Sequence, residues 1–162
     1  MPWCWAGRKP DRHSDPLVPP GLALPGKFGF DEYCLWQLTR RPDRYKNPGL
    51  EVNGKEMDYT KGEYGPDLVN DYALDYISRK KAEPFFLYYP LVLPHDPWIE
   101  PPGYQRGDGG KPEEEQQRKF AAMVEYTDKM VGRVTAQLET LKLSEKTLVI
   151  FTGDNGTYPR LH

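Results

Sequence analysis

The chain has 162 residues, of which 22 are basic and 24 acidic, so its formal net charge is −2. This length suits one domain with a hydrophobic core, but the balanced charge provides no broad electropositive face for nucleic acid, and no apolar run approaches the roughly 20 residues that cross a bilayer. We therefore expect neither nucleic acid nor membrane as a partner.

The first 27 residues are rich in proline and charge and show no helical or strand period, which predicts an irregular, poorly ordered lead-in. Residues 1–20 contain no uninterrupted apolar stretch of the kind that a signal peptide requires. The aromatic segment FGFDEYCLW, residues 28–36, is then expected to pack onto a core. Asn53-Gly54 predicts a tight turn between two short strands.

Two helices are predicted further along the chain, one from Pro66 to the basic residues at 79–81 and one from Pro112 to Leu141. The apolar face expected for the second helix consists of Phe120, Met123, Val124, Thr127, Val131, Val134, Leu138 and Leu141. The apolar runs FFLYYPLVL, residues 85–93, and TLVIF, residues 147–151, are typical of buried strands. This alternation predicts an α/β fold in which helices flank a mainly parallel sheet.

A polar loop follows each of these two expected strands. Right-handed crossovers would bring the carboxyl ends of both strands to one edge of the sheet. The sequence therefore predicts a polar cleft lined by His95, Asp154 and Asn155, with Asp96 as a further candidate. These residue types suit an oxyanion or a metal, because Asp and Asn supply hard oxygen ligands.

Each of these features also has a purely structural interpretation. Asp-Asn-Gly after a strand is a common turn, and a histidine between prolines is commonly satisfied by its own loop. Three arginines, Arg40, Arg41 and Arg44, are able to hold an anion but are more typical of a solvated surface. Neither cysteine has a base beside it in sequence. The two cysteines, Cys4 and Cys34, allow at most one disulfide, and Cys34 among aromatic residues is typical of an inert buried thiol.

Three features in this order resemble the central part of the sulfatase family, within the alkaline-phosphatase-like superfamily. They are a strand followed by His95-Asp96-Pro97, the helix EYTDKMVGRVTAQLETL with Asp128 and Gly132, and TLVIFTGDNG. The segment GFDEYCLWQL is also similar to bacterial arylsulfatase-like proteins. The resemblance covers about residues 24–157 and implies part of an alkaline-phosphatase-like α/β sandwich with a mainly parallel sheet.

The resemblance also implies roles for three residues. His95 corresponds to the histidine that contacts the sulfate ester, and Asp154 with Asn155 corresponds to the ligands of a divalent metal, usually calcium. Calcium takes about six to eight oxygen ligands, so these two form an incomplete site. The substrate would be a sugar or aryl sulfate. Members are often periplasmic, secreted or lysosomal, and the localisation and oligomeric state of this chain stay open.

The family nucleophile is a formylglycine made from the cysteine or serine of a C/S-x-P-x-R motif, and neither Cys4 nor Cys34 has that context. We therefore expect residues 28–162 to be the central part of a sulfatase catalytic domain, truncated at both ends and inactive alone. Two alternatives stay open: a phosphodiesterase or phosphonate hydrolase of the same superfamily, and a non-catalytic remnant that acts as a structural or binding module.

Overall fold

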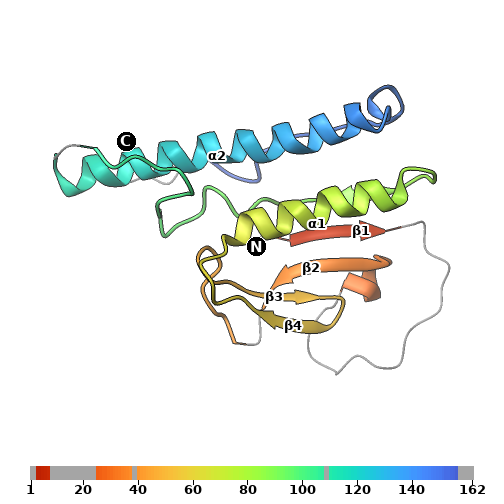
Figure 1. Cartoon of the computed structure of the whole chain (residues 1–162), viewed down its shortest axis with the longest axis horizontal. Helices are drawn as coiled ribbons and strands as arrows, with labels where there is room; N and C mark the ends of the chain where they lie inside the picture. The colour runs from red at the N-terminus through yellow and green to blue at the C-terminus, as the bar shows by residue number, and fades with distance from the viewer. Residues whose placement is uncertain (1–2, 8–24, 38–39, 108–109, 157–162) are drawn as a thin grey trace.

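The computed structural model describes residues 3–7, 25–37, 40–107 and 110–156, with only the backbone described for 3–7. Its sheet has five strands in the order β4-β3-β2-β1-β5 (Figure 1). The strands are β1 Trp3–Gly7, β2 Glu32–Trp36, β3 Gly49–Val52, β4 Lys55–Asp58 and β5 Phe86–Tyr88. Strand β1 falls within the stretch predicted to be irregular, so the sequence analysis missed it.

Every pairing in this sheet is antiparallel, so the predicted mainly parallel sheet is wrong for the described residues. The prediction inferred crossovers from the alternation of helices and strands. That alternation does not fix the strand direction, because β5 pairs with β1, a strand that precedes both helices. Antiparallel neighbours need only short connections, and β3 and β4 have one.

The predicted hairpin at Asn53-Gly54 is confirmed. Both residues have positive φ, 50° and 82°, as a two-residue hairpin turn of the right twist requires. Val52 pairs with Lys55 across the turn. The Asn53 side chain also accepts a hydrogen bond from the backbone N–H of Tyr33 at 2.7 Å, which ties the hairpin to β2.

Both predicted helices are confirmed, as α1 Gly65–Lys80 and α2 Pro112–Thr140. In Figure 1, α1 lies between the sheet and α2, and it contacts β1, β2 and α2. The buried face of α2 only partly matches the prediction, because Tyr126 and Met130 are buried while Val124 is 44% exposed. Within the described residues, no helix combines the length and hydropathy needed to span a bilayer.

The two apolar runs predicted to be buried strands differ from that expectation. In the first run only Phe86–Tyr88 is a strand, at the edge of the sheet, and Phe86 is 60% exposed. The second run forms no strand, and its residues 148–151 are all exposed. A continuous apolar run indicates a buried strand only when other elements cover it, and no described element covers 148–151.

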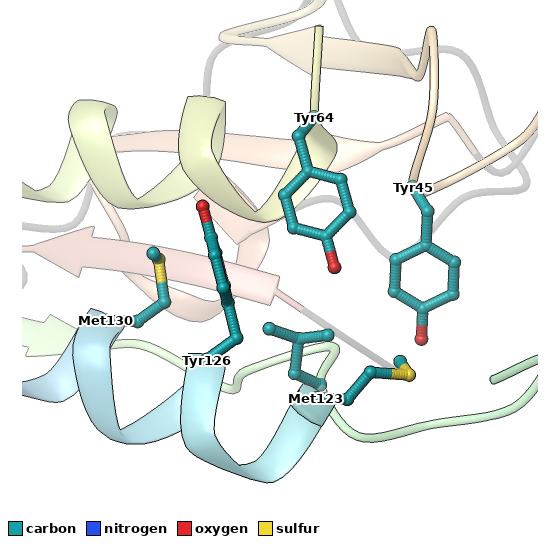
Figure 2. Packing of buried hydrophobic residues seen from close by; sticks show 6 residues of the cluster. Tyr45, Tyr64, Met123, Tyr126 and Met130 are labelled. Carbon is teal, nitrogen blue, oxygen red and sulfur yellow. The ribbon is translucent and has the colours of Figure 1, made fainter. Parts of the chain in front are cut away.

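The main hydrophobic cluster lies between the start of α1, the middle of α2 and two loops. It consists of Tyr45, Tyr64, Leu93, Met123, Tyr126 and Met130. Figure 2 shows Tyr45 and Tyr64 directed toward the side chains of α2. The rings of Tyr64 and Tyr126 meet edge to face with centroids 5.4 Å apart, a favoured aromatic geometry. This cluster joins the loops that carry Tyr45 and Leu93 to both helices.

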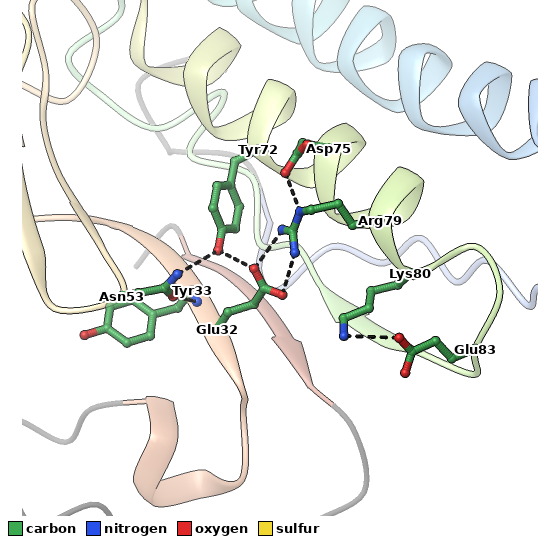
Figure 3. Close-up of polar contacts among 8 residues, drawn as sticks. All are labelled: Glu32, Tyr33, Asn53, Tyr72, Asp75, Arg79, Lys80 and Glu83. Carbon is green, nitrogen blue, oxygen red and sulfur yellow. Dashed lines mark hydrogen bonds and ion pairs between the residues drawn. The ribbon is translucent and has the colours of Figure 1, made fainter.

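A polar network fixes α1 on the sheet (Figure 3). Glu32 of β2 accepts two hydrogen bonds from the Arg79 guanidinium, at 3.0 and 2.7 Å, and one from the Tyr72 hydroxyl at 2.9 Å. Burial alone would raise the pKa of Glu32, but these hydrogen bonds and the charges of Arg79 and Lys80 outweigh it and hold the pKa below its ordinary value.

Glu32→Gln is therefore expected to lower the free energy of unfolding by about 1–2 kcal/mol near neutral pH, because it removes charge-assisted hydrogen bonds. A carboxylate with a lowered folded-state pKa stabilises the fold above its ordinary pKa and loses that effect as the pH falls through the lowered value. The difference between wild type and variant should thus shrink on acidification. Urea titrations followed by circular dichroism at several pH values measure it.

The matched control is Glu83→Gln, which removes the same charge from the Lys80–Glu83 pair, whose nitrogen and oxygen lie 3.4 Å apart at the surface. We expect a loss below about 0.5 kcal/mol for this exposed pair. An equal loss in both variants at all pH values would contradict the role given to Glu32.

Candidate functional site

The loop that carries Arg44 is held by short-range hydrogen bonds. The Asp43 carboxylate accepts from the backbone N–H groups of Tyr45 at 2.7 Å and Lys46 at 3.1 Å. Such a turn around an aspartate is a common local structure. Gly65, the first residue of α1, donates its backbone N–H to the Tyr45 carbonyl at 2.6 Å. The backbone on both sides of Arg44 is thus fixed.

Tyr45 connects this loop to the loop that carries His95. Its ring is 1% exposed, and its hydroxyl donates to the backbone carbonyl of His95. Burial raises the pKa of Tyr45, so the phenol stays a neutral donor at physiological pH. The two loops are 50 residues apart in sequence, and this buried contact sets their relative position.

The His95 imidazole is half-exposed, with 52% of its side-chain surface accessible. Its Nδ1 lies 2.6 Å from the Asp96 carbonyl oxygen and 3.0 Å from the Asp96 carboxylate. Both of these oxygens can only accept from Nδ1, so Nδ1 carries the proton. No described residue makes a hydrogen bond to Nε2, which leaves that nitrogen for a ligand. Asp96, left without a role by the family resemblance, therefore positions the ring.

Arg44, which the sequence analysis considered more typical of a solvated surface, lies beside His95. Its Nη1 lies 3.5 Å from Nδ1 of His95, and its guanidinium lies over the Trp36 ring at 5.2 Å. Arg40, from the same sequence cluster, instead pairs with Asp58 and Glu56. The only sequence signal was three neighbouring arginines, and it could not separate a paired arginine from one beside the histidine.

Asp154 and Asn155 lie in an exposed segment at the end of the described chain. Asn155 bonds only locally, donating to the Gly156 carbonyl at 3.1 Å. The structure records no contact from either residue to His95, and the parallel-sheet argument that placed them at one edge does not apply here. The shared cleft therefore stays a prediction.

The oxygen donors of Asp154 and Asn155 are of the type that calcium prefers, but their number does not fit a complete site. Calcium requires about six to eight ligands. In the part of the chain that the structure describes, no group of three or more His, Cys, Asp or Glu residues is placed to hold a metal ion.

Cys34 is not a nucleophile in this fold. It is 2% exposed, and burial raises the pKa of its thiol to about 12. A thiolate is the reactive form, so this thiol is inert near neutral pH. The side chain of Cys4 lies outside the described residues.

A small cavity lies between Trp36, Arg44, the start of α1 and residues 89–93, with a volume of about 30 Å³. A cavity of this size holds about one water molecule. It is too small for a sugar or an aryl ring, and His95 does not line it.

The site described above consists of an imidazole held by Asp96, with the guanidinium of Arg44 beside it. A family model described as Sulfatase matches residues 9–160 of the chain. The chain belongs to the sulfatase family. This membership implies the α/β fold of the alkaline-phosphatase-like superfamily, and the described part of this sulfatase chain forms helices and a small antiparallel sheet.

Curated relatives support the same family. The sulfatase chain is 32% identical to human arylsulfatase H over 125 residues, which cover 76% of the chain and 20% of that protein. It is 31% identical over 134 residues to the Escherichia coli protein named uncharacterized sulfatase YdeN, covering 82% of the chain and 23% of that protein. It is 34% identical over 87 residues to dog N-acetylgalactosamine-6-sulfatase, covering 52% of the chain and 15% of that protein.

The sulfatase chain thus spans less than a quarter of the length of these relatives. No solved structure gives a significant match to the chain.

Gly65→Ala tests the contact that positions Arg44. A Cβ at Gly65 would collide with the Arg44 carbonyl oxygen, which belongs to the backbone and cannot rotate away. We expect the free energy of unfolding to fall by about 1–3 kcal/mol, the usual range for overpacking. Thermal unfolding followed by circular dichroism measures it.

Gly132→Ala is the control, since a Cβ there meets no atom within 4 Å and Gly132 lies in the interior of α2. Alanine in a helix is expected to stabilise the protein by about 0.5–1 kcal/mol relative to glycine. If Gly65→Ala were as stable as wild type, the close approach of α1 to the Arg44 loop would be disproved.

Proposed function

We propose that this chain is part of a sulfatase-like hydrolase that cleaves sulfuric esters, and that His95 binds the sulfate group. The family match over residues 9–160 carries this proposal. The geometry of His95 supports it, because the ring is half-exposed and held through Nδ1 by Asp96. That arrangement leaves Nε2 without a partner among the described residues, so it can take up a proton and then donate it to an anionic group.

The nucleophile of the reaction lies outside this sequence in our proposal. The sulfatases that the sequence resembles use a formylglycine from a C/S-x-P-x-R motif, and the thiol at Cys34 is buried and inert. The chain supplies part of the substrate site, and we expect it to have no hydrolytic activity alone.

Asp154 and Asn155 are proposed as two ligands of a divalent metal, most consistent with Ca²⁺, because both offer hard oxygen donors. The remaining ligands would come from parts of the catalytic domain other than those described here. No role in catalysis is assigned to this ion from the described residues, since they do not complete its coordination.

The substrate proposed is a sulfate ester of a sugar or an aryl group. The names of the relatives, N-acetylgalactosamine-6-sulfatase and arylsulfatase H, support these two classes. A phosphodiesterase or phosphonate hydrolase of the same superfamily is the second candidate, because a site for one tetrahedral oxyanion also suits others. A C/S-x-P-x-R motif encoded in frame upstream of Met1 would favour the sulfatase.

Binding of 4-nitrophenyl sulfate to the chain tests the role of His95. We expect saturable shifts of the His95 imidazole signals in ¹H–¹⁵N NMR spectra, and a dissociation constant about tenfold higher in His95→Gln, which loses a hydrogen bond to a charged group. His13→Gln makes the same chemical change elsewhere in the sequence and should leave the constant unchanged.

A parallel titration with 4-nitrophenyl phosphate separates the two candidates. Tighter binding of the phosphate than of the sulfate would favour phosphoryl chemistry. Binding of neither ester would support the non-catalytic remnant and end the proposal. Release of 4-nitrophenol by the chain alone would show instead that the chain contains its own nucleophile.

Calcium titration by calorimetry tests the metal ligands. Because the chain offers two of about six to eight ligands, we expect affinity no better than the millimolar range. Asp154→Asn removes the charged donor and should abolish the remaining heat of binding. Glu139→Gln, which removes one carboxylate from the exposed surface of α2, is the control. Tight binding that survives Asp154→Asn would place the calcium site elsewhere.

A further inference from the structure

The backbone around Arg44 is held by hydrogen bonds and by a close approach to α1. Asp43 accepts hydrogen bonds from the two residues after Arg44, and Gly65 of α1 packs directly against the Arg44 carbonyl. A side chain on such a loop starts from a defined position. Binding residues on rigid loops lose less entropy when a ligand arrives.

The Arg44 side chain is also held in place. Its guanidinium carbon lies over the Trp36 ring, 5.2 Å from the ring centroid, and the indole N–H of Trp36 donates to the Pro42 carbonyl at 2.8 Å. A cation–π contact with an aromatic face holds the guanidinium without using its N–H donors. Among the described residues, Arg44 takes part in no ion pair, in contrast to Arg40 and Arg79. The charge of Arg44 is therefore not neutralised by a carboxylate of the described chain.

The charge of Arg44 lies next to the imidazole of His95. Nδ1 donates to Asp96, so its 3.5 Å separation from Nη1 of Arg44 is an approach of two donor nitrogens rather than a hydrogen bond. This approach places the Arg44 guanidinium directly beside the imidazole ring, although Nδ1 itself is already engaged with Asp96. When the imidazole is protonated on both nitrogens, an oxyanion at its exposed side can accept from Nε2–H and from the guanidinium together.

We infer that Arg44 is a second substrate-binding residue, which holds the tetrahedral oxyanion of the ester together with His95. This inference rests on the proposed function of His95 and adds a residue to the same site. The planar fork of arginine offers two parallel hydrogen bonds to one oxyanion, which a lysine does not. Trp36 and Asp96 are positioning residues for the two donors.

The test uses inorganic sulfate as the probe, titrated into the chain at constant ionic strength and followed in ¹H–¹⁵N spectra. The signals of the His95 imidazole and of Nε–H of Arg44 should shift with one common dissociation constant. Arg44→Gln should raise this constant about tenfold, the effect of losing a hydrogen bond between charged groups. Arg44→Lys should raise it less, because the charge remains and the fork is lost.

The control variant is Arg40→Gln. It removes the same charge four residues before Arg44, from a side chain that is already paired with Asp58 and Glu56. It should leave sulfate binding within about twofold of wild type, because an exposed and screened charge contributes little at a distance. An equal effect of Arg40→Gln and Arg44→Gln would mean a general charge effect and would overturn the inference.

The outcomes separate this inference from the proposed function. If His95→Gln weakens sulfate binding but Arg44→Gln and Arg44→Lys do not, Arg44 is no ligand while the role of His95 stands. If substitution of neither residue weakens sulfate binding, both proposals fail. If Arg44→Gln does not fold, the wild-type spectra and Arg44→Lys still test the inference. An Arg44 signal that does not shift when sulfate is added excludes a contact between Arg44 and sulfate. A parallel phosphate titration shows whether the pair prefers one oxyanion.

Discussion

The site depends on one buried phenol, that of Tyr45. Its ring stacks near Tyr64 with centroids 6.2 Å apart and is closed off by Met123 of α2, while its hydroxyl donates to the backbone of His95. Removing a hydroxyl from water without a partner is unfavourable, so this hydrogen bond is maintained as long as the core is packed. The core therefore positions the histidine loop directly, and the neighbouring Arg44 follows from the same contact.

The charged residues of the chain divide into those that hold the fold and those that are available to a ligand. Arg79 is shared between Glu32 and Asp75 and ties α1 to β2, and Arg40 is paired with acidic residues of β4. In these pairs the charge is already compensated. At Arg44 an aromatic ring takes the place of a carboxylate, so orientation is achieved without neutralisation. That difference, rather than the presence of arginine, distinguishes a binding group from a structural one.

The exposed run at 148–151 is the clearest conflict between local pattern and observed structure. Leu148 is 83% exposed and Ile150 77%, although both belong to the most strand-like segment of the sequence. Strand formers need partners for their backbone and cover for both faces, and neither is present among the described residues. Phe86 and Tyr88 lie on the edge strand β5, which has a backbone partner in β1 but leaves both side chains exposed. For residues 86–88 the predicted strand is confirmed, whereas the predicted burial of its side chains is wrong.

The sequence by itself determined the features that depend on neighbouring residues. Both helices, the Asn53-Gly54 hairpin and the packed segment around Tyr33 follow from local period and turn chemistry. The role that the family motifs give to His95 stays a prediction. Only the tertiary structure decided the antiparallel sheet, the exposure of 148–151 and the meeting of Arg44 with His95. Arg44 and His95 are 51 positions apart in the sequence. Their contact is set by the packing of Tyr45 and Gly65, which no local pattern encodes.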